Sequence, residues 1–120
     1  MVVLLVADLP RSIAFYRHLG IKFPVDAAER HSVQVSIGGR HQLVLTTRFS
    51  ERIPGYEPRT GLARIVLEFF IDDDASVDRM YAELVDSGYH GQRPPFLTEF
   101  GAYMCMVEDP DENVVLVTAA

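Results

Sequence analysis

The chain has 120 residues, of which 48% are hydrophobic and 23% charged, a composition that suits one globular domain and excludes a disordered chain. Its net charge of −6 argues against a nucleic-acid partner, which would require a basic face. A single cysteine, Cys105, cannot form an internal disulfide, so we expect a reducing compartment.

The first half of the chain predicts a strand, a helix and a hairpin. The apolar start over residues 2–6 is too short for a membrane span or a signal peptide, so we expect a strand in a soluble, cytoplasmic protein. Asp8 is the predicted N-cap of a helix with Pro10 in its first turn and a stop at Gly20. Alternating polar and apolar residues then predict a hairpin of strands 32–37 and 42–47.

The second half repeats this plan. Residues 62–71 predict a strand, and the sequence DDDAS begins a helix that stops at Gly88. Strands 102–107 and 114–118 follow, joined by the turn DPDEN. The connecting segments 48–61 and 89–101 contain several prolines and glycines and are predicted to be irregular.

The two predicted helices correspond at an offset of 68 residues. Three apolar positions and the stop glycine of one helix then coincide with those of the other: Leu9 with Val77, Ile13 with Tyr81, Tyr16 with Leu84, and Gly20 with Gly88. An internal repeat of one strand–helix–strands unit is therefore predicted.

Two motifs in this repeat, D-L-x-x-S-I-x-F-Y-x-x-L-G over residues 8–20 and D-P-D-x-N over 109–113, resemble those of the vicinal oxygen chelate superfamily. That superfamily contains glyoxalase I, extradiol dioxygenases, fosfomycin-resistance enzymes and bleomycin-resistance proteins. The resemblance implies one α+β domain over residues 1–120, built from paired βαβββ modules of about 1–47 and about 62–120. Their curled sheet would form a cup around a small-molecule ligand, and the chain would pair as a homodimer.

One residue departs from the family's turn motif. Glu112 stands where the family commonly has glycine, which adopts a positive φ without strain. Either Glu112 tolerates that strain, or the turn differs and Asn113 takes the left-handed position.

Metal-binding members of the family carry a histidine on the first strand, an acid on the last strand and two ligands between them. By resemblance these positions fall in this sequence at Met1 or Val3, Val44, Val66 (or Arg64 in a register shifted by two) and Leu116. None of these side chains suits Zn²⁺ or Fe²⁺, and His18, His31, His41 and His90 lack the spacing of a site. We therefore expect no metal and no cofactor.

Strand residues point alternately to two faces, which gives the residues expected to line the cup. Leu67 and Phe69 belong to the predicted helix-covered face, with Ile65 and Ile71 in the same set. The predicted ligand-binding residues are Val44, Thr46, Arg64, Val66, Glu68, Phe70 and Leu116. The same alternation turns Gln42, Val114 and Thr118 towards the cup, with Tyr103 and Cys105 as further candidates.

Glu68 interrupts an otherwise apolar strand, where an unpaired carboxylate is costly to bury. It has a structural interpretation, as a partner of Arg64 or as an interface residue. It also has a functional interpretation, as a ligand-binding acid or a general base. Cys105 lies between two methionines and is interpreted as an apolar filler, because no histidine is placed to activate it.

The resemblance and the missing ligands together predict a metal-free protein of the bleomycin-resistance type that binds an amphipathic or aromatic molecule. The alternative is an enzyme of the same superfamily: a metal-dependent lyase, isomerase or dioxygenase whose ligands lie in another register, or an isomerase that uses Glu68. A structural or regulatory role with a protein partner is a third possibility.

Overall fold

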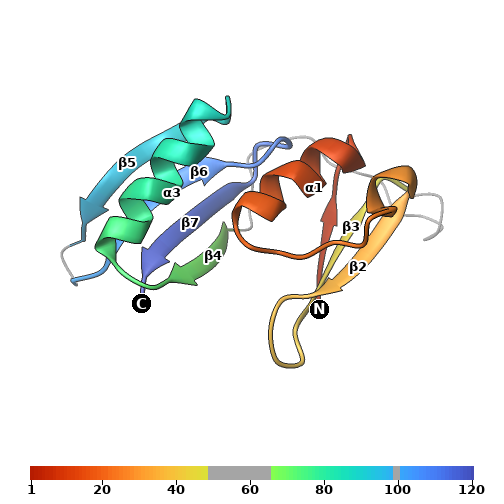
Figure 1. The fold of residues 1–120 in the computed structure, drawn as a ribbon, viewed down its shortest axis with the longest axis horizontal. Helices are drawn as coiled ribbons and strands as arrows, with labels where there is room; N and C mark the ends of the chain where they lie inside the picture. The colour runs from red at the N-terminus through yellow and green to blue at the C-terminus, as the bar shows by residue number, and fades with distance from the viewer. Residues whose placement is uncertain (49–65, 99–100) are drawn as a thin grey trace. The chain divides into compact units, whose positions relative to one another are not determined.

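The computed structural model describes residues 1–48, 66–98 and 101–120, and the chain divides into two compact units between residues 62 and 63 (Figure 1). In its described residues each unit has one α-helix and one mixed sheet, which confirms the predicted α+β class. Neither of these helices is long and apolar enough to cross a membrane.

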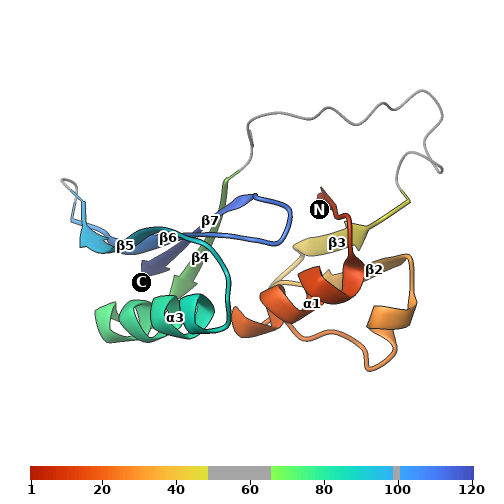
Figure 2. The same cartoon turned by 90° about the horizontal axis from the view of Figure 1, so that it is seen from above.

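The first unit contains β1 (Val2–Leu5), α1 (Leu9–His18), the short 3₁₀ helix η1 (Ala27–Glu29), β2 (Ser32–Ser36) and β3 (Gln42–Thr46). Its strand order is β1-β3-β2, with β1 parallel and β2 antiparallel to the central β3. The helix α1 lies on one face of this sheet (Figure 2).

The second unit contains β4 (Val66–Ile71), α3 (Asp74–Asp86), β5 (Gly91–Leu97), β6 (Tyr103–Glu108) and β7 (Val114–Ala119). Its strand order is β4-β7-β6-β5, with β4 parallel to β7, and α3 covers one face (Figures 1 and 2). This is a complete βαβββ module. The described part of the first unit has three strands, and residues 23–29, which the offset of 68 aligns with β5, contain η1 instead.

Both helices begin at an aspartate. Asp8 Oδ1 accepts a hydrogen bond from the Arg11 amide (3.0 Å), which confirms the predicted N-cap. Asp73 Oδ1 accepts one from the Ser76 amide (2.7 Å), and hydrogen bonding to Ser76 lowers the pKa of this carboxyl. Each cap satisfies a helix amide that has no partner within the helix.

Both helices also end in the same way. Gly20 and Gly88 adopt φ angles of 85° and 92°, a left-handed conformation that favours glycine. In each case the amide after the glycine donates back into the last turn: Ile21 to Tyr16 (3.2 Å), and Tyr89 to Leu84 (3.1 Å). The internal repeat is therefore visible in the hydrogen bonds of the helix ends.

Each unit buries the inner side of its helix against its sheet. In the first unit Leu9, Ile13, Leu43 and Leu45 are buried. In the second unit the corresponding residues are Val77 and Leu84 of α3 and Val115 and Val117 of β7, whereas Val85 of α3 is exposed. Complete burial of an aliphatic side chain contributes about 1.5–3 kcal/mol, so these contacts are the main source of stability in each unit.

The segment 89–101 corrects one expectation, because most of it forms the edge strand β5 and not an irregular loop. One of Pro94 and Pro95 is tolerated because the outer side of an edge strand needs no hydrogen bonds, and the other falls where the pairing with β6 is interrupted between Arg93 and Phe96. The pairing with β6 shifts register on either side of Arg93, as expected where prolines interrupt a ladder. The start of β5 lies against α3, since a Cβ atom at Gly91 would collide with the ring of Tyr81.

The turn between β6 and β7 is organised by Asp109, which is only 4% exposed. Its Oδ1 accepts hydrogen bonds from the amides of Asp111 (2.9 Å) and Asn113 (2.8 Å), and its Oδ2 accepts one from Asn113 Nδ2 (2.8 Å). Glu112 has a φ angle of 64°, so it occupies the left-handed position itself. The alternative, in which Asn113 takes that position, is wrong.

Candidate functional site

The sheet of the second unit has one face covered by α3 and one that this helix leaves uncovered, which we call the open face. Val115 and Val117 of β7 lie on the covered face, fully buried, and pair with Leu67 and Phe69 of β4. The intervening residues and their partners on β6 and β5 form the open face: Val66, Glu68, Phe70, Val114, Leu116, Thr118, Met104, Met106, Glu108, Arg93 and Phe96.

Strand pairing arranges eight of these side chains in two rows that cross all four strands. The first row, from β5 to β4, consists of Arg93, Met106, Leu116 and Glu68. The second consists of Phe96, Met104, Thr118 and Phe70. Directly paired residues are close enough for their side chains to touch. The first row is therefore a continuous strip of surface, whereas Met104 and Thr118 of the second row are buried.

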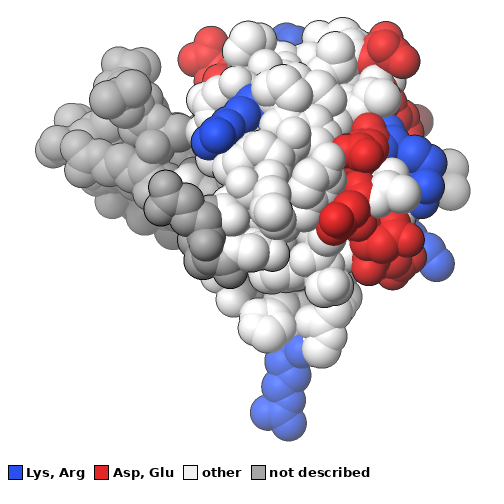
Figure 3. All heavy atoms as spheres, turned by 90° about the vertical axis from the view of Figure 1, so that its left-hand side faces the viewer, with Lys and Arg blue, Asp and Glu red and all other residues white. Residues whose placement is uncertain are grey.

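The open face is apolar and partly exposed. Val66 and Phe70 are 54% and 65% exposed, whereas the valines of the covered face of β7 are buried. Acidic side chains instead gather over α3 and the two residues before it, where segment 72–86 carries Asp72, Asp73, Asp74, Asp78, Glu83 and Asp86 (Figure 3). Exposed apolar side chains next to one another are typical of a binding surface.

Glu68 is held by a hydrogen bond on this face. Thr118 donates its hydroxyl to Glu68 Oε1 over 2.8 Å, from the neighbouring strand β7. Thr118 is 2% exposed, whereas Glu68 is exposed. The partner expected from the sequence, Arg64, lies outside the described residues.

The predicted residues of the first unit lie on the equivalent face of its own sheet. Val44 pairs with Val3 of β1 and with Gln34 of β2, on the side opposite the buried Leu43 and Leu45. Thr46 is buried, and its hydroxyl accepts a hydrogen bond from the amide of Arg48 (3.2 Å). The structure thus brings the described candidates together in two sets, one on each sheet.

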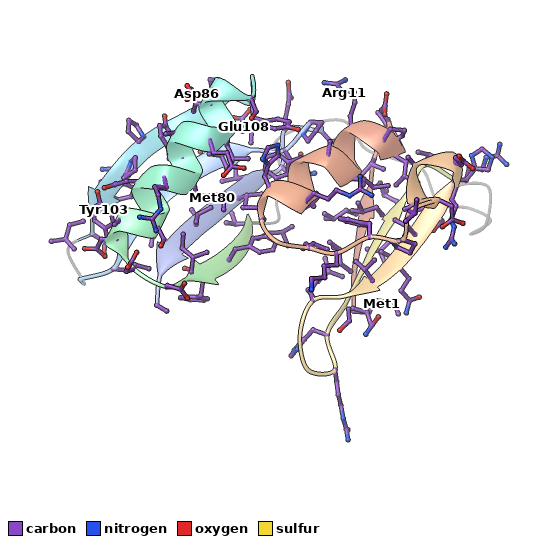
Figure 4. All side chains as sticks on the ribbon, in the orientation of Figure 1. Met1, Arg11, Met80, Asp86, Tyr103 and Glu108 are labelled. Atoms are coloured by element: carbon purple, nitrogen blue, oxygen red, sulfur yellow. The ribbon has the colours of Figure 1, made fainter. Side chains whose placement is uncertain are left out.

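Tyr103 and Cys105 are not part of the open face, contrary to expectation. Both lie on the covered face of β6 (Tyr103 is labelled in Figure 4): Tyr103 donates its hydroxyl to Asp78 of α3 (2.8 Å), and Cys105 is fully buried. The hydrogen bond to Asp78 raises the pKa of Tyr103, and burial raises that of Cys105 to about 11. The interpretation of Cys105 as an apolar filler agrees with this burial.

Comparison with known proteins agrees with this architecture. The profile of the glyoxalase/bleomycin resistance protein/dioxygenase superfamily matches residues 1–117. The chain belongs to this superfamily. The resemblance read from the two motifs is therefore confirmed. No protein of curated function matches the chain significantly in sequence.

Solved structures of the superfamily share the fold. A glyoxalase-related enzyme from Fulvimarina pelagi is 19% identical, with a TM-score of 0.83 over 99% of this chain and 85% of that one. A glyoxalase/bleomycin resistance protein/dioxygenase family enzyme from Burkholderia phytofirmans is 17% identical, with a TM-score of 0.81 over 98% and 94%. A lactoylglutathione lyase from Agrobacterium tumefaciens is 25% identical, with a TM-score of 0.69 over 99% and 90%.

The internal repeat of this superfamily member shows which residues occupy matching positions in its two sheets. Val3 pairs directly with Val44, and Glu68 pairs directly with Leu116, in the same parallel arrangement of outer and inner strand. With Leu116 taken as the counterpart of Val44, as the resemblance implies, Glu68 is the residue opposite Leu116, whereas Val66 lies opposite Val114. We therefore take Val3, Val44, Glu68 and Leu116 as the four matched positions.

Only one of these four matched residues has a side chain that binds hard metal ions, the carboxylate of Glu68. Across residues 1–48, 66–98 and 101–120, no group of three or more histidines, cysteines, aspartates or glutamates is arranged to hold a metal ion. A catalytic zinc site takes three protein ligands, so the matched positions do not supply one.

Four residues of the two rows were missed by sequence reasoning: Met104, Met106, Arg93 and Phe96. Met104 and Met106 alternate with Tyr103 and Cys105 along β6. Assigning the methionines, and not Tyr103 and Cys105, to the open face would therefore have found them. The two β5 residues had no such signal, because Pro94 and Pro95 hide the strand.

Proposed function

We propose that this protein binds a small amphipathic or aromatic molecule without a metal ion, in the manner of the bleomycin-resistance members of its superfamily. The observation that carries the proposal is the open face of the second unit, where the exposed Val66 and Phe70 of β4 lie on the same face as Leu116 of β7 and Met106 of β6. An apolar surface with a few polar groups is the usual composition of a small-molecule site.

The chemistry of the matched positions supports the metal-free form of this proposal. Val3, Val44 and Leu116 are hydrocarbon side chains, and one carboxylate alone cannot retain Zn²⁺, Fe²⁺ or Mn²⁺. These residues instead contribute apolar contact area to a ligand.

The test combines metal analysis with ligand titration. Protein purified without a histidine tag should contain much less than one equivalent of Zn, Fe, Mn or Ni by mass spectrometry. Fluorescence titration with the neutral aromatic probe N-phenyl-1-naphthylamine should show saturable binding, which Phe70→Asp should weaken while leaving the thermal melt cooperative. Stoichiometric metal in the purified protein would contradict the proposal.

A second candidate function is an enzyme, and Glu68 is the observation that favours it. Its Oε1 is fixed by Thr118, while no hydrogen bond to its Oε2 is present within the described part of the chain. A fixed carboxylate with a free oxygen on an exposed face is suited to general-base chemistry. The similarity to a lactoylglutathione lyase gives the reaction to try first.

The enzyme candidate predicts turnover that depends on this carboxylate. Formation of lactoylglutathione from methylglyoxal and glutathione would be followed with and without added Zn²⁺ or Ni²⁺. Activity that Glu68→Gln removes, without loss of folding, would favour the enzyme. Absence of turnover under both conditions would leave binding as the function.

A further inference from the structure

Among the described residues of the open face Arg93 is the positively charged one, and it is held in a defined orientation. Its guanidinium carbon lies over the Phe96 ring, 3.4 Å from the centroid, which is too short a distance for a guanidinium standing edge-on and therefore indicates a stacked cation–π contact. Residues three apart in a regular strand point to opposite faces. Here the register shifts around Pro94 and Pro95 place both side chains opposite Met106 and Met104, on the same face.

The stack leaves the hydrogen-bonding edge of Arg93 available. A guanidinium carries its N–H donors in its plane, so contact through the flat side with Phe96 uses none of them. Among the residues that the structure describes, Arg93 makes no hydrogen bond or ion pair. The nearby carboxylate of Glu108 accepts its hydrogen bond from Gln92 (3.2 Å) and not from Arg93.

Charges of opposite sign lie at the two ends of the first row. Arg93 is on the edge strand β5, Glu68 is on the edge strand β4, and Met106 and Leu116 form the apolar floor between them. Three inter-strand spacings of about 4.8 Å separate the ends, or about 14 Å in all. This is the length of a two-ring aromatic molecule with a polar substituent.

We infer that the open face selects an anionic amphipathic ligand, whose carboxylate or sulfonate binds the edge of Arg93 and whose apolar body lies across Met106 and Leu116. Glu68 would repel an anionic group at the other end of the row, so the ligand has one direction of binding. This inference rests on the proposed small-molecule function and adds the ligand's charge and orientation to it.

Two fluorescent probes with nearly the same apolar body test the inference. 8-Anilinonaphthalene-1-sulfonate carries a sulfonate, and N-phenyl-1-naphthylamine lacks it. The wild-type protein should bind the sulfonate more tightly. Arg93→Gln should weaken sulfonate binding about fivefold, a typical value for one exposed ionic contact, and should leave binding of the neutral probe unchanged.

Two further variants serve as controls. Arg40→Gln removes one positive charge from the turn between β2 and β3 and should change neither affinity. Arg93→Lys keeps the charge but loses the planar fork, so it should retain part of the preference for the sulfonate. Thermal melts of all variants should match that of the wild type.

The outcomes separate this inference from the function on which it rests. If the wild type binds both probes and Arg93→Gln weakens both equally or neither, Arg93 does not select anions and the inference is wrong. If the folded wild type binds neither probe, the open face is not a small-molecule site and the proposed function fails as well.

Discussion

The hydroxyl of Thr118 donates a 2.8 Å hydrogen bond to Glu68, which joins a buried residue of β7 to an exposed carboxylate of β4. This pair gives Glu68 a structural role that does not require Arg64. It also fixes the one carboxylate among the four matched positions of the two sheets, so the same contact bears on stability and on function.

We expect the pair to be energetically coupled. Glu68→Leu and Thr118→Val should each lower the free energy of unfolding by about 1 kcal/mol, because each variant breaks the hydrogen bond between the Thr118 hydroxyl and the exposed Glu68 carboxylate. The double variant should lose less stability than the sum of the two single losses, because it contains neither the hydroxyl nor the carboxylate and so leaves no buried hydroxyl without an acceptor. Urea denaturation of the four proteins measures this, and strictly additive losses would show that the contact contributes nothing.

Glu112 offers a test of backbone strain. At φ 64° a residue with a Cβ atom is strained, so Glu112→Gly should raise the free energy of unfolding by about 0.5–1 kcal/mol, despite the greater entropy of glycine in the unfolded chain. Glu112→Ala is the matched control, because it removes the carboxylate but keeps the Cβ atom. Equal stability of the glycine and alanine variants would argue against strain at this position.

Cys105 predicts a loss of stability at alkaline pH. Burial raises the pKa of its thiol from 9.0 to about 11, so the unfolded chain ionises first as the pH rises. Stability from this residue is complete below pH 9 and is lost as the pH rises towards 11, by at most about 1.4 kcal/mol per pH unit. Urea denaturation should show a smaller difference in the free energy of unfolding between pH 8 and pH 10 for Cys105→Ala than for the wild type.

The homodimer implied by the resemblance is also open to measurement. β1 and β4 are each the outermost strand on one side of their own sheets, and outer strands with unpaired backbone groups favour association. Light scattering coupled to size exclusion should give twice the chain mass of 13.5 kDa. A monomer mass at micromolar concentration would contradict the prediction.

Much of this fold could be predicted because local chemistry determines it. Asp8 and Gly20 mark the ends of α1 by their own capping preferences, and alternation along 66–71 correctly assigned Glu68 and Phe70 to the open face. These features depend on nearby residues. The single domain assumed over residues 1–120 stays a prediction, as do the ligand contacts.

The predictions were wrong where pairing between strands distant in the sequence determines the structure. β5 contains Pro94 and Pro95 and becomes a strand only because β6 lies beside it. The faces of Tyr103 and Cys105 depend on how β6 aligns with β7, which the sequence of β6 alone does not specify. The row of Arg93, Met106, Leu116 and Glu68 requires all four strands in register, so it could not be seen before the structure.

The two prolines of β5 also determine where this sheet can recruit further chains. Proline has no backbone N–H, so one of two successive prolines removes a donor from the outer edge of the strand that an incoming strand would need. Strand-by-strand polymerisation, the first step towards amyloid, is therefore discouraged at this end of the sheet. At the other end, β4 contains no proline, so any growth of the sheet by strand addition would proceed in one direction only.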